Sequence, residues 1–78
     1  MNTTTSTKQQ TLTQAQQAII DTYQREIVRE HKLYQEAVAA YESGHGSRCE
    51  VEYHDRQLNE LTKERRETLA WFAAQAAS

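Results

Sequence analysis

The chain contains no proline and only two glycines, and both glycines lie in one short break at residues 43–46. Proline and glycine are the residues that most often interrupt a helix, so their absence elsewhere leaves long stretches free to be helical. Two stretches of helical pattern, residues 13–43 and about 56–76, flank the break. The sequence therefore predicts a mainly α fold, with two long helices in an antiparallel αα-hairpin.

Several function classes are disfavoured by what the composition lacks. Cys49 is the only cysteine, which excludes an internal disulfide and gives no sign of an oxidising compartment. No apolar run approaches the ~20 residues of a membrane span, and the N-terminal segment lacks the apolar core of a signal peptide. We expect a protein that remains in the cytoplasm in which it is made, with no membrane partner.

The chain also lacks a large excess of positive or negative charge. Nine Lys and Arg stand against eleven Asp and Glu, for a net charge of −2, and no basic stripe is present. Binding to nucleic acid through phosphates needs such a stripe, so no nucleic-acid specificity is expected. The chain has 78 residues, of which 37% are hydrophobic. Since so small a chain buries only ~60% of its unfolded surface, we expect it to gain apolar contact from a partner or from its own copies.

Two regions are predicted along the chain. Residues 1–12 are almost entirely Thr, Ser, Gln and Asn. Such a segment cannot offset its ordering entropy alone, so we predict a polar N-terminal arm that is disordered unless it is bound. Residues 13–78 are predicted to form a single helical-hairpin domain.

The first predicted helix has clear ends and a coiled-coil seam. Residues 13–16 read Thr-Gln-Ala-Gln, a capping-box pattern, and Gly44 is free to take the left-handed conformation that ends a helix. Between these ends, apolar residues recur at the steps of a heptad. The recurring residues are Ile20, Ile27, Tyr34 and Tyr41, with Tyr23 and Ala37 completing the seam and Ile19, Leu33 and Ala40 widening it.

The segment from Ser47 to Arg56 supports two interpretations. Residues 47–50 form another capping-box pattern, which would begin the second helix at once. However, Cys49, Val51 and Tyr53 alternate with polar residues, as in a strand. We expect a short β segment over 48–54. The second helix is then marked by Leu58, Leu61, Leu69, Phe72 and Ala76.

Two charged residues fall on the apolar stripes, Glu30 and Arg65. The plain interpretation is that both side chains reach water from the edge of the seam. The alternative is a Glu30–Arg65 ion pair, within one subunit or between two, which would fix the register of the helices.

His45, Cys49 and His54 lie close together in the sequence, as metal ligands often do. Zinc ligands must converge on one point at ~2.0–2.3 Å, and these three share a face on neither a helix nor a strand. A catalytic cysteine would need an oriented base and an oxyanion site within a cleft, which two helices do not provide. We expect no metal, no cofactor and no enzymatic activity.

The most apolar stretch contains Trp71 and Phe72 side by side. Phe72, with Leu69, is expected to close the open end of the hairpin against Ile19, Ile20 and Tyr23. Trp71 lies about 100° round the helix from Phe72, so one of the two aromatic residues must face outward. An outward tryptophan is typical of an interface.

Three segments, residues 34–44, 51–56 and 58–65, together resemble the small head–tail joining (head-completion) proteins of tailed bacteriophages. Members of that family combine a helix ending in Ser-Gly, a short strand or hairpin, an Arg-x-Leu step and a charged second helix. The resemblance covers about half of the chain. The stretch between Tyr53 and Leu58 is too short here for a full two-stranded hairpin. The resemblance implies a non-enzymatic ring of identical subunits under the portal, which links capsid to tail within the virion.

Two kinds of function remain open. The first is a structural adaptor in a homo-oligomeric ring, in contact with portal and tail components. The second is a small free helical-hairpin regulator, an inhibitor or co-chaperone, that masks the surface of one partner. For either role the predicted interface residues are Ile20, Ile27, Glu30, Tyr34, Tyr41, Arg65, Trp71 and Phe72.

Overall fold

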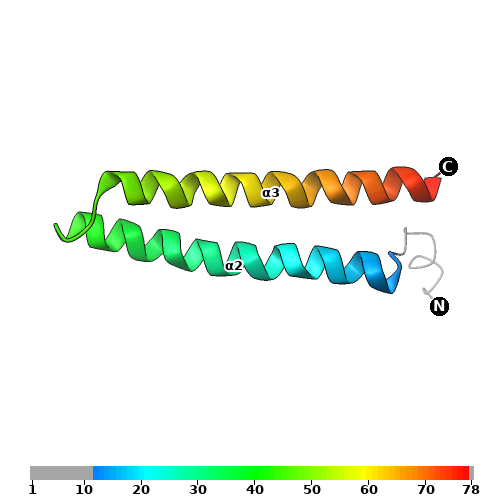
Figure 1. The fold of residues 1–78 in the computed structure, drawn as a ribbon, viewed down its shortest axis with the longest axis horizontal. Helices are drawn as coiled ribbons and strands as arrows, with labels where there is room; N and C mark the ends of the chain where they lie inside the picture. Colours follow the sequence, from blue (N-terminus) through cyan, green and yellow to red (C-terminus); the bar gives the residue numbers. More distant parts are fainter. Residues whose placement is uncertain (1–11, 78) are drawn as a thin grey trace, which may run out of the picture.

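The computed structural model describes residues 12–77 and consists of two helices, α2 (Gln14–Glu42) and α3 (Arg48–Ala77). The helices run antiparallel along their whole length, with the connection at one end of a rod of 55 × 27 × 17 Å (Figure 1). The predicted αα-hairpin is therefore confirmed. The predicted N-terminal arm falls almost wholly on residues 1–11, which lie outside the described residues.

The capping box at the start of α2 is present as predicted. The Thr13 hydroxyl accepts a hydrogen bond from the Gln16 backbone N–H at 3.1 Å, and the Gln16 side-chain oxygen accepts one from the Thr13 N–H at 3.0 Å. Each residue thus satisfies an end amide of the other, which fixes where the helix begins.

Both glycines are needed to end α2. Gly44 has φ +86°, in the left-handed region, and its N–H donates to the Tyr41 carbonyl at 3.1 Å while the His45 N–H donates to the Ala40 carbonyl at 2.8 Å. This pair of bonds is a Schellman motif, which satisfies carbonyls that the helix end would leave free. Gly46 is required by close approach, because a Cβ there would lie 2.9 Å from the Ala40 Cβ.

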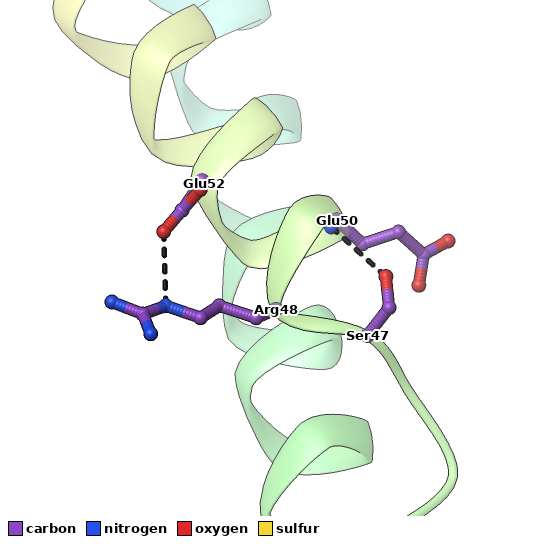
Figure 2. Close-up of polar contacts among 4 residues, drawn as sticks. All are labelled: Ser47, Arg48, Glu50 and Glu52. Atoms are coloured by element: carbon purple, nitrogen blue, oxygen red, sulfur yellow. Dashed lines mark hydrogen bonds and ion pairs between the residues drawn. The ribbon is translucent and has the colours of Figure 1, made fainter.

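The start of α3 corrects the prediction of a β segment over 48–54, because these residues are helical. The Ser47 hydroxyl accepts a hydrogen bond from the Glu50 N–H at 3.2 Å, and the Arg48 side chain donates to the Glu52 carboxylate, one turn along α3, at 3.0 Å (Figure 2). The capping pattern at 47–50, and not the strand pattern, therefore decides the structure.

The alternation of apolar residues in this segment was misleading because two patterns overlap there. Val51, His54 and Leu58 are spaced by three and four residues and are all half-buried, whereas Cys49 and Tyr53 are exposed. An isolated strand would leave its backbone groups unpaired, but a helix satisfies them internally and still turns one face toward α2. The residues at helical spacing are therefore the ones that pack against α2.

The core is a narrow seam between the helices. Its buried residues are Ile20, Ala37 and Phe72, which are 4%, 8% and 6% exposed. Other seam residues are half-buried, because two helices cover only one side of each other. Half-buried seam residues include Tyr23, Ile27, Tyr34, Leu58, Leu61 and Leu69.

Neither helix is long and apolar enough to cross a membrane.

Candidate functional site

Three open grooves run along one side of the hairpin. The first is lined by Tyr23 of α2 and by residues of α3 that include Glu64 and Trp71. The second lies nearer the turn, between Leu33 and Ala40 of α2 and Glu50 of α3. The third lies along α2 and shares Tyr23 with the first.

These grooves belong to a single face, because their linings fall on two rows at steps of seven residues. A step of seven returns to nearly the same side of an α-helix. Both rows line the second groove, so they lie on the same side of the seam. We call the two rows and the residues that line the grooves between them the groove face. The rows are Ile19, Glu26, Leu33 and Ala40 on α2, and Glu50, Gln57, Glu64 and Trp71 on α3.

The groove face exposes large apolar side chains. Ile19 is 45% exposed, Leu33 is 37% exposed and Trp71 is 59% exposed. Tyr53, 51% exposed, lies one helical turn from Glu50 on the same side of α3. Solvent-exposed apolar residues that gather on one face are typical of a protein-contact surface.

The same face is acidic. Five glutamates line the three grooves, and no lysine or arginine is among the described residues that line them. All five side chains are exposed. They are Glu26, Glu36, Glu50, Glu64 and Glu67.

The predicted interface residues divide by burial. Ile20 and Phe72 are buried in the hairpin's own seam, and Tyr41 and Trp71 are exposed, 48% and 59%. The structure therefore leaves Tyr41 and Trp71 available for contact with another protein, whereas the others serve chiefly to hold the hairpin together. The half-buried ones are Ile27, Glu30, Tyr34 and Arg65.

Glu30 has a partner that the sequence did not suggest. Its carboxylate is paired with the His54 ring nitrogen Nδ1 across the seam, and the two side chains are 14% and 19% exposed. Within this chain Glu30 therefore neither reaches into solvent nor pairs with Arg65, so these two interpretations were wrong. A Glu30–Arg65 pair between two subunits stays a prediction. His54 could have been found from its spacing of three after Val51 and four before Leu58, which places it on the seam.

Arg65 lies half-buried on the seam, between the levels of Leu61 and Leu69. Its Nε is buried and has no hydrogen-bond partner among the described residues. The aliphatic stem of an arginine can cover apolar surface, so Arg65 contributes packing to the seam.

The aromatic pair is arranged as predicted. Phe72 is buried and Trp71 is exposed, and their ring centroids are 5.8 Å apart with planes tilted by 47°. Trp71 thus extends the apolar core outward onto the groove face. Tyr53, which was not among the predicted interface residues, is exposed on the same face because it sits outside the seam.

The three residues considered as metal ligands are not brought together. His54 is in the seam with Glu30, whereas His45 and Cys49 are exposed. Within residues 12–77, the structure holds no group of three or more His, Cys, Asp and Glu side chains that could bind a metal ion. What the described surface offers chemically is an acidic face with exposed aromatic side chains.

Comparisons with protein-family models, with characterised proteins and with solved structures found no match to this chain.

Proposed function

We propose that this protein is a non-enzymatic structural adaptor that acts by docking to other proteins. The observation that carries the proposal is the groove face, on which Ile19, Leu33 and Trp71 are exposed along a rod whose seam buries few residues. A third element laid on this face would bury those side chains and extend the small core. Docking therefore uses apolar surface that the hairpin cannot cover itself.

The more specific form of this proposal is a component of a virion head–tail connector, in a homo-oligomeric ring that contacts portal and tail proteins. It is supported by the resemblance of residues 34–65 to head–tail joining proteins and by exposed apolar residues away from the groove face. Val28 is 60% exposed and lies about 160° round α2 from Glu26. Tyr41 is 48% exposed beside the turn. A ring subunit needs separate surfaces for its own copies and for the structures above and below.

A second candidate is a free regulator, an inhibitor or co-chaperone, that masks one partner's surface. It is favoured by the position of the three grooves on one face. A regulator with one partner needs only such a face, so Val28 and Tyr41 would have no role in its binding.

The experiment compares Trp71→Ala with Val28→Ser in the native particle or complex. A connector requires both surfaces, so we expect each variant to lose a different association, measured by sedimentation and by electron microscopy of the assembly. A regulator would lose its single complex with Trp71→Ala and keep it with Val28→Ser. Circular dichroism must show that both variants remain helical.

One result would contradict docking in every form. If both variants, and a third in which Tyr41 is changed to Ser, form all native associations normally, then exposed apolar side chains on this hairpin have no binding role.

A further inference from the structure

We infer that the groove face binds an amphipathic helix of a different protein, in which lysine or arginine residues flank the apolar stripe. The inference rests on the proposed docking function and names the chemistry of the partner. It is carried by the charge, the shape and the exposed residues of this one face.

The charge of the face selects a basic partner. Its five glutamates are exposed, and the ion pairs among the described residues are Arg48–Glu52 and His54–Glu30, which use none of the five. Carboxylates that have no cation of their own can each accept a lysine or arginine from a partner. Complementary charge of this kind steers association and excludes partners of the wrong sign.

The same charge argues against a second copy of this chain on the face. In a symmetric dimer through the grooves, each copy would bring its glutamates against those of the other, and the groove linings supply no lysine or arginine in exchange. Like charges placed together at an interface are unfavourable. Ring neighbours, under the connector proposal, would therefore use other surfaces, such as that of Val28.

The shape of the face selects a helix. Two parallel rows of side chains border the seam, which is the groove that a third helix occupies in a bundle. A peptide that binds as an added β-strand would need a free sheet edge to pair its backbone, and residues 12–77 contain no strand. A helix instead satisfies its own backbone and presents side chains to the rows.

The apolar anchors set the length of the partner. The lining of one groove includes Tyr23 and Trp71, and that of another includes Leu33 and Ala37. Tyr23 and Ala37 are 14 residues apart on α2, which is ~21 Å along its axis. A partner helix of about four turns, with apolar residues in a heptad pattern, would reach both grooves.

Trp71 provides a direct probe, because it is the only tryptophan of the chain and lies on the face. The test peptide is a synthetic helix of about 18 residues with leucine at heptad core positions and lysine elsewhere. The matched control peptide has glutamate in place of every lysine. We expect saturable binding of the lysine peptide with a blue shift of Trp71 fluorescence, and binding at least about tenfold weaker for the glutamate peptide.

Charge-matched variants separate this face from the charge of the whole protein. Glu64→Gln with Glu67→Gln removes two charges from the first groove, and Glu42→Gln with Asp55→Asn removes two from exposed positions outside all three grooves. Anisotropy of the labelled lysine peptide should show about tenfold weaker binding for the first pair and less than about a twofold change for the second. Equal weakening by both pairs would overturn the inference, since it would show attraction without a site.

Two further outcomes keep this inference distinct from the proposed function. If the protein self-associates with Trp71 buried, and Trp71→Ala abolishes that association, a second copy occupies the face. Docking then stands and the basic helix is wrong. The inference is also overturned if the lysine and glutamate peptides bind equally well, or if neither binds. The docking proposal itself fails only if the native associations survive the variants described above.

Discussion

The two ends of the hairpin differ, because the chain connects the helices at one end only (Figure 1). At the turn end the chain itself connects the helices, and Gly46 lies close against Ala40. At the open end no covalent connection is near, and Phe72 and Ile20 are buried instead. The turn end is therefore closed by backbone geometry, and the open end by apolar side chains.

The difference follows from the entropy of closing a loop. Gly46 and Ala40 are six residues apart in the chain, whereas Ile20 and Phe72 are 52 apart. Holding distant residues together costs more conformational entropy, so the open end must gain more from burial. Large buried side chains are therefore needed at the open end, where no covalent connection holds the helices together.

Removal of Phe72 tests this comparison most strongly. Phe72→Ala should destabilise the hairpin by about 3–5 kcal/mol, because it removes a buried aromatic ring and leaves a cavity. Urea denaturation followed by far-ultraviolet circular dichroism measures the change. Trp71→Ala is the matched control, and its effect on stability should be below ~1 kcal/mol because that ring is largely exposed. Equal effects of the two changes would mean that the open end has no real core.

The turn end is tested by Gly46→Ala. The added Cβ would lie 2.9 Å from the Ala40 Cβ and 3.0 Å from the Tyr41 backbone nitrogen, so the loop must shift. We expect a loss of about 1–3 kcal/mol, measured by the same denaturation. Gly46→Ala should cost less stability in a chain that already carries Ala40→Gly than in the wild type, because the Ala40 Cβ is then absent. A Gly46→Ala protein as stable as the wild type would show that backbone closeness does not hold this end.

The middle of the seam can be tested with a double-mutant cycle. Glu30→Ala, His54→Ala and the double variant should give a coupling energy of about 1.5 kcal/mol, because the pair is largely removed from water. Arg48 and Glu52 form an exposed pair on α3 and are the control, with an expected coupling below ~0.5 kcal/mol. Equal coupling in the two cycles would indicate that the Glu30–His54 contact does not link the helices.

The helix caps at the two ends should give the smallest effects. Thr13→Ala at the open end and Ser47→Ala at the turn end each remove a side-chain acceptor for an end amide, at a cost of about 1 kcal/mol. Amide hydrogen exchange should show where the helix frays. We expect Thr13→Ala to expose only the first turn of α2. Uniform loss of protection through both helices would instead mean that the hairpin opens as one unit.

The parts of this structure that were predictable are those fixed by local chemistry. The caps at Thr13 and the left-handed Gly44 depend on neighbours within a few residues, and both were found from the sequence. The segment 48–54 was predicted wrongly because alternation and helical spacing coexist there. Packing against α2 decides between the two patterns, because it half-buries Val51 and His54 on one side of α3.

The sequence alone determined two helices, one break and an apolar seam, because the period of apolar residues and the turn residues are local signals. The tertiary structure decided which residues meet across that seam. It paired Glu30 with His54, left Trp71 outside, and gathered glutamates from both helices on one face. These features depend on the rotation and register of α3 against α2, which no local pattern specifies.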